Sequence, residues 1–214
     1  MYVDSAVELG SDDAALEIPW ASEDGSLCYC DLRNNPALID RLFEAQHWWE
    51  MREFLIRVNV ADFPMQTAKS DVWSTTEISP EEEIFSASWK FASYIDLLFS
   101  DHAPRFSLPA HQALMAKLCT LLQRVPDMPA AIEFVLRHCY YHVLDGAATD
   151  GDCEESRRHQ LKRIVPDETL SDSMRGFYLT LYVSGFGNSE QEARQRWSIA
   201  LKLLQHVLVQ ALHL

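Results

Sequence analysis

The 214-residue sequence is poor in the residues that interrupt or cross-link a chain. It has 7 glycines and 9 prolines against 48% hydrophobic residues, which excludes a disordered or fibrous protein. The five cysteines form an odd, scattered set, which argues against a disulfide framework and indicates a reducing compartment. Cys28 and Cys30 have no second close pair, so a structural zinc site is not expected.

Long apolar runs and a basic N-terminus are also missing. No segment approaches the roughly 18 unbroken apolar residues that a membrane-spanning helix needs. Residues 1–20 lack the basic start and apolar stretch of a signal peptide. We therefore expect a cytoplasmic protein that does not bind membranes.

Positive charge is scarce. The chain has 32 acidic and 18 basic residues, a net charge of -14, and residues 1–32 contain no Lys or Arg. Phosphate contacts need a basic surface, so nucleic acid and anionic lipid are not expected as partners. Acidic surfaces are usually just solvated, although a basic protein partner stays open.

Recognisable motifs and repeats are lacking as well. The sequence has no glycine-rich phosphate loop, no Gly-x-Ser-x-Gly elbow and no His-Glu-x-x-His motif. No internal repeat appears, so we expect a single domain over residues 1–214. Within it, residues 1–34 read as an irregular acidic arm and residues 145–171 as a long polar loop.

What the sequence does contain is a series of helix signals. Ser79 and Glu82 form a capping box, Ser189 and Glu192 form another, and a proline opens several apolar stretches. These signals predict an all-α fold, an irregular bundle of about six helices with an extended N-terminal arm. The expected helices cover residues 35–58 with a break near Trp48, 79–100, 109–125, 129–144, 176–184, and 189 onward.

Two segments have the alternation of extended chain. Leu16, Ile18 and Trp20 alternate within the arm, which indicates an extended segment laid against the core with Trp20 as its anchor. Residues 176–184 also alternate apolar and other side chains. A lone strand has no partner, so the helical interpretation of 176–184 is favoured, and the strand is the alternative.

The helix expected at 129–144 carries a candidate metal site. His138, His142 and Asp145 occupy positions i, i+4 and i+7, and both imidazoles fall on the apolar stripe. A buried imidazole needs a partner, which is either a metal ion or a hydrogen bond to a carbonyl, tyrosine or carboxylate.

Other residues are candidates for the opposite side of that site. Asp96 lies on an aromatic stripe of the helix expected at 79–100, and Glu44 and His47 have the Glu-x-x-His spacing found in di-iron helical bundles. Iron or manganese would suit these ligands. The predicted metal ligands are Glu44, His47, His138, His142 and Asp145, and the predicted ligand-pocket residues are Trp89, Asp96 and Tyr141.

Two functions follow from these patterns. The first is a helical-bundle protein, oxidoreductase-like, with a metal or small ligand in the His/carboxylate pocket. The second is a non-catalytic interaction or regulatory protein that forms a homodimer. Its C-terminal helix would supply the apolar seam, formed by Trp197, Leu201, Leu204, Leu208 and Leu212.

Overall fold

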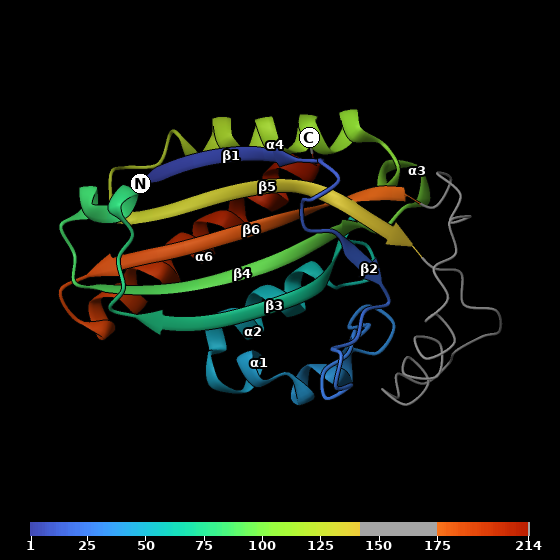
Figure 1. Ribbon diagram of the computed structural model, residues 1–214, viewed down its shortest axis with the longest axis horizontal. Coiled ribbons are helices and arrows are strands. Elements are labelled where there is room, and N and C mark those ends of the chain that lie inside the picture. The colour runs from blue at the N-terminus through green and yellow to red at the C-terminus, as the bar shows by residue number, and fades with distance from the viewer. Residues whose placement is uncertain (142–174, 214) are drawn as a thin grey trace.

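The computed structural model describes residues 1–141 and 175–213, and it is built on one six-stranded sheet with the order β1-β5-β6-β4-β3 (Figure 1). The short strand β2 pairs with β5 as well, and β1 and β2 run parallel to β5 while the other pairs are antiparallel. The strands are β1 (Tyr2–Glu8), β2 (Leu16–Ile18), β3 (Met65–Thr75), β4 (Trp89–Phe99), β5 (Ala130–Tyr141) and β6 (Arg175–Gly187). The all-α prediction is therefore wrong.

Helices cover one face of this sheet. The helical elements are η1 (Pro36–Arg41), α1 (Phe43–His47), α2 (Trp49–Val58), η2 (Pro80–Phe85), α3 (His102–Arg105), α4 (Leu108–Leu122) and α6 (Glu190–His213). In Figure 1, α2, α4 and α6 lie behind the sheet, and α6 runs across β6 and β4. We call the opposite face of the sheet, which is turned to the viewer in Figure 1, the open face.

The two helices with the clearest apolar periodicity are confirmed. In α4 the buried residues Leu114, Met115, Leu118 and Leu122 recur at helical spacing, and Ser107 caps the first turn. At the second predicted capping box, Glu192 N–H donates to the Ser189 hydroxyl, and the Glu192 carboxylate accepts from the backbone N–H of Asn188. Residues 36–58 are helical too, with breaks at Leu42 and at Trp48.

The helices predicted at 79–100 and 129–144 are wrong. The capping box at Ser79 starts only η2, which ends at Ser86 with a left-handed φ of 48°. In the strands that follow, several residues of the open face, such as Ala92, Leu98 and Val135, are buried as well. Apolar residues therefore occur on both faces of these strands, and the period of two is weak. The segment expected at 176–184 is the central strand β6, and it has the partners β4 and β5 that a lone strand would lack.

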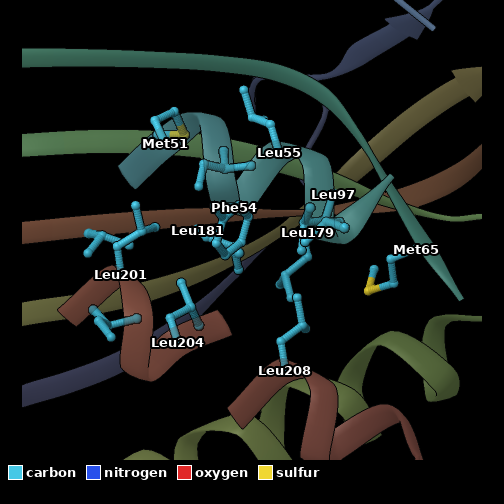
Figure 2. Packing of buried hydrophobic residues seen from close by; sticks show 14 of the residues in the cluster. Met51, Phe54, Leu55, Met65, Leu97, Leu179, Leu181, Leu201, Leu204 and Leu208 are labelled. Atoms are coloured by element: carbon cyan, nitrogen blue, oxygen red, sulfur yellow. The ribbon is translucent and has the colours of Figure 1, made fainter. Parts of the chain in front are cut away.

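The core fills the space between the sheet and its helices. Leucines of β4, β6 and α6 meet α2 side chains there, as Figure 2 shows; they are Leu97, Leu179, Leu181, Leu201, Leu204 and Leu208, packed with Met51, Phe54 and Leu55. Trp197 is fully buried, and its Nε1 donates to the Ser93 hydroxyl at 2.9 Å. This bond satisfies the one polar group of the largest buried side chain.

The predicted dimer seam on the C-terminal helix is overturned by the same packing. Trp197, Leu201, Leu204 and Leu208 are buried against the protein's own sheet and helices, so they present no surface to a second copy. A homodimer formed elsewhere stays a prediction. Among the helices in residues 1–141 and 175–213, none is long and apolar enough to cross a membrane.

Gly185 lets α6 approach the sheet closely. A Cβ at this position would overlap the backbone of Trp197 and Ala193. We expect Gly185→Ala to lower the free energy of unfolding by about 3 kcal/mol, because neither backbone can move without displacing α6. Urea unfolding measures this change.

Gly10→Ala is the control for this substitution, since the added carbon would meet only the Asp13 carboxylate, 3.0 Å away on an exposed loop. It should cost less than about 1 kcal/mol. Equal losses for the two variants would contradict the packing of α6 on β6.

Candidate functional site

A cavity of about 370 Å³ lies beside the outer edge of β3. It lies, partly open to solvent, between this edge, residues 16–32 of the arm and the chain around α1, and we call it the β3 cavity. Apolar side chains form much of its wall, among them Trp20, Leu27, Leu32, Leu42, Phe43 and Ala68. Its size and lining are those of a small-molecule site.

A bulge in β3 fixes the arm against the cavity. The register of β3 against β4 shifts between Thr67 and Lys69, which leaves Ala68 as an extra residue. The Ala68 carbonyl accepts a 2.7 Å hydrogen bond from the indole N–H of Trp20. The expectation that Trp20 anchors an extended segment is therefore confirmed, and Leu16 beside it is buried.

Charged groups of both signs stand on the cavity wall. Lys69 lies over the Trp20 ring, with Nζ 5.1 Å from its centroid, and the Glu44 carboxylate accepts a hydrogen bond from Ser70. Arg41 is exposed, and no ion pair holds its guanidinium within the part of the chain that the structure describes. A ligand entering the cavity thus meets a cation that is free to bind an anionic group.

The cysteines supply no activated thiol to this cavity. Cys28 is disulfide-bonded, so the inference of a reducing compartment loses its support. Burial raises the pKa of the Cys30 thiol, which keeps it protonated and unreactive. The described cavity lining contains no histidine, and the hydroxyl of its Ser70 donates to the Glu44 carboxylate.

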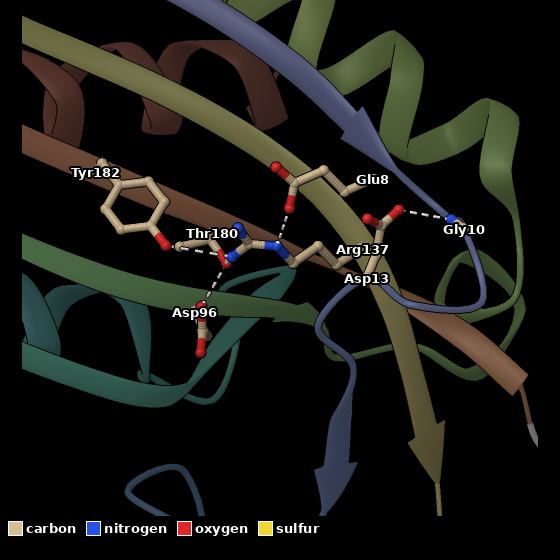
Figure 3. A network of polar contacts seen from close by, with 7 residues as sticks. All are labelled: Glu8, Gly10, Asp13, Asp96, Arg137, Thr180 and Tyr182. Carbon is tan, nitrogen blue, oxygen red and sulfur yellow. Dashed lines mark hydrogen bonds and ion pairs between the residues drawn. The ribbon is translucent and has the colours of Figure 1, made fainter.

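A polar network crosses the open face of the sheet (Figure 3). Arg137 of β5 donates through Nε to Glu8 of β1 at 2.7 Å, and through Nη1 to the hydroxyls of Thr180 and Tyr182 at 3.2 and 3.3 Å. Thr180 in turn donates to Asp96 Oδ1 at 2.6 Å. The network therefore joins β1, β5, β6 and β4 through side chains alone.

Asp96 is the buried end of that network. Burial raises its pKa to about 6, while the hydrogen bond from Thr180 and the charges of Lys69 and Arg137 act in the opposite direction. Its hydrogen-bond partner Thr180 and the nearby cations Lys69 and Arg137 all belong to strands of the sheet, so within the described residues Asp96 supports the open face.

Two histidines flank Phe177 on the helix-covered side. The His138 ring centroid is 5.4 Å from that of Phe177, and the His111 centroid is 5.6 Å from it. Among the described residues, His138 Nδ1 and His111 Nε2 are buried without a hydrogen-bond partner. Burial also lowers the pKa of His111, which keeps its ring neutral.

The predicted metal ligands do not converge where the structure describes them. His138 lies in β5, whereas Glu44 and His47 lie in α1; Glu44 binds Ser70, and His47 is exposed and bonded to the Phe43 carbonyl. The described residues include no group of three His, Cys, Asp or Glu side chains able to hold a metal ion. His142 and Asp145 lie outside the described residues. The oxidoreductase-like interpretation is overturned by this finding.

The predicted ligand-pocket residues are also separated. On a helix, Trp89 and Asp96 would lie on the same stripe. In strand β4 they are separated by an odd number of positions, so their side chains lie on opposite faces of the sheet. Trp89 packs toward the main core, and Asp96 joins the network of the open face. Tyr141 belongs to the small apolar cluster beneath the arm.

Sequence reasoning singled out Trp20 and Glu44 of the β3 cavity and Asp96 of the open face, but missed the basic residues of the cavity and the other members of the network. Arg41 and Lys69 had no motif to mark them, because the arm brings the cavity together from distant segments. For the network, the sequence did hold a signal: Glu133, Val135 and Arg137 are two residues apart, which is the spacing of side chains that share one face of a strand.

The chain matches no family model, no curated protein and no solved structure.

The raised pKa of Asp96 predicts a pH-dependent stability. Its pKa is 3.8 when the chain is unfolded and about 6 when it is folded, so the folded state binds the proton more tightly. Protonated Asp96 therefore adds to the free energy of unfolding. This stabilisation is full below about pH 4 and is lost as the pH rises through 6, so the free energy of unfolding falls by about 3 kcal/mol. Urea unfolding between pH 3.5 and 7.5 measures it.

Asp96→Asn removes this titration. The free energy of unfolding of the protein minus that of Asp96→Asn should fall as the pH rises from 4 to 7. A difference that is constant across this range contradicts the burial of Asp96.

Proposed function

We propose that the protein binds a small amphiphilic molecule in the β3 cavity, with an apolar body against the arm and an anionic group at Arg41. The partly open cavity of about 370 Å³, beside a guanidinium that has no ion-pair partner among the described residues, is the observation that carries the proposal. The ligand is held without a metal ion, and the protein's part is binding and not turnover.

The apolar wall supports an aromatic or aliphatic ligand body. Trp20, Leu27 and Phe43 present faces that exclude water from such a body, and burial of about 100 Å² of apolar surface stabilises a complex by about 2.5 kcal/mol. The hydrogen bond of Trp20 to Ala68 holds this wall in place before the ligand arrives.

The charges support an anionic group on that ligand. Arg41 and Lys69 are the basic side chains of the lining. The carboxylate of Glu44 is already bonded to Ser70, and that of Asp71 accepts from the backbone N–H of Val72 at 2.7 Å. Each of these carboxylates thus has a neighbouring donor, whereas the guanidinium of Arg41 has no ion-pair partner among the described residues and keeps its donors available.

Binding of 8-anilinonaphthalene-1-sulfonate tests the proposal, because this dye combines an aromatic body with one anionic group. We expect Arg41→Gln to weaken its binding about tenfold through loss of the charge-assisted hydrogen bonds. Leu27→Glu should weaken it at least as much, since a carboxylate on the apolar wall repels the sulfonate. Fluorescence titration at constant protein concentration measures both.

Two matched variants on α2 serve as controls. Arg57→Gln removes the same charge from an exposed position, and Ile56→Glu adds a carboxylate at a side chain 49% exposed, comparable with Leu27 at 62%. Neither residue lines the cavity, so neither substitution should change dye binding. No dye binding by the protein, or equal losses in the control variants, would sink the proposal.

A further inference from the structure

The open face carries a row of directly opposed residues across five strands. The register places Tyr94 of β4 directly opposite Tyr182 of β6. The remaining positions of the row, on β3, β5 and β1, are all acidic residues. In strand order the row reads Asp71, Tyr94, Tyr182, Glu133, Asp4. Aromatic rings thus occupy the middle of the row, and carboxylates occupy both ends.

The aromatic rings extend beyond this row. Trp73, two residues from Asp71 on the same side of β3, has its ring centroid 6.4 Å from that of Tyr94, and the Tyr94 and Tyr182 centroids are 6.3 Å apart. All three rings are partly exposed. At the edge strand β1, Tyr2 is 50% exposed and donates to Asp4 at 3.1 Å.

The acids at the β1 end are only partly compensated by cations. Glu133 is exposed, and burial together with the neighbouring carboxylates of Asp4 and Glu8 raises its pKa. The charges of Arg137 and Lys90 act in the opposite direction, but the Nε of Arg137 is already bonded to Glu8. A further cation on the face, Lys90, is paired with Glu82. The site therefore has room for positive charge that the described protein does not supply.

We propose that the open face docks an extended basic segment of another polypeptide, with cationic side chains over the tyrosines and between the flanking carboxylates. The geometry suits guanidinium groups, which stack on aromatic faces and bind carboxylates in pairs. Arg137 already shows this contact within the face, because its guanidinium carbon lies 5.9 Å from the Tyr182 ring centroid.

The length of the row sets the length of the segment. Five strands at about 4.8 Å spacing span about 19 Å, which about six extended residues cover. The chain's net charge of -14 attracts such a segment from a distance, and the row then selects where it binds.

Acetyl-hexaarginine amide is the probe, titrated at physiological ionic strength by isothermal calorimetry so that unspecific attraction is screened. We expect Glu133→Lys to weaken binding at least about tenfold, because a carboxylate contact becomes a repulsion. Trp73→Leu should weaken it about threefold through loss of an aromatic face. Glu133 is exposed beside two other acids, so the lysine should leave the melting temperature unchanged or raised.

Glu53→Lys is the matched control, since Glu53 is exposed on α2 behind the sheet and its substitution changes the net charge equally. It should weaken binding less than about twofold. Equal losses for Glu133→Lys and Glu53→Lys mean that net charge alone attracts the peptide, which overturns the proposal. It is also overturned if the protein does not bind the peptide, or if Glu133→Lys abolishes a self-association in which a second copy occupies the face.

Discussion

The close approach of α6 to the sheet at Gly185 is the constraint on which the rest of the structure depends. With no Cβ at this point, the backbone of α6 reaches β6, and Trp197 enters the core to bond Ser93 of β4. This placement lets one helix bury the middle of the sheet, and it leaves α2 and α4 to complete the same layer. Large leucines of α6 then fill the space between them, so the helices form a single cover on one face.

On the open face, by contrast, no large helix packs on the strands in the part of the chain that the structure describes, so its buried polar groups depend on side chains of the strands. Without a helical layer, its buried groups are held by side chains of the strands, through the Arg137 and Thr180 hydrogen bonds that end at Asp96. The arm covers one end, where Trp20 is bonded to the bulge at Ala68, and η2 covers the other end, where Phe85 stacks on Phe186. Both candidate sites arise from this division: the β3 cavity lies under the arm, and the aromatic row crosses the face between the two covered ends, with Asp71 and Tyr94 common to both sites.

The elements that sequence reasoning predicted correctly are those whose pattern is local. α4 and α6 have caps and one-sided apolar periodicity, and each signal lies within the helix itself. The predictions for β4, β5 and β6 failed because buried apolar residues occur on both faces of these central strands, and because the partners of the strands lie far away in the chain. The same error misplaced the candidate site. On a helix, Glu133 and Arg137 would lie on a solvent-exposed flank, whereas on strand β5 both lie on the open face, Arg137 in the polar network and Glu133 in the aromatic row. His138 was correctly placed toward the core, yet no metal ligands accompany it among the described residues.

Hydroxyl-radical footprinting with mass spectrometry tests the central claim, that helices cover one face of the sheet and leave the other to its own side chains. On this account Tyr2 and Trp73 are oxidised readily, while Trp197 and Phe134, which are buried in the core between the sheet and its helices, stay protected until the protein unfolds. Oxidation of Trp197 in the folded protein at a rate similar to that of Trp73 would contradict the account, because it would mean that α6 does not lie on the sheet.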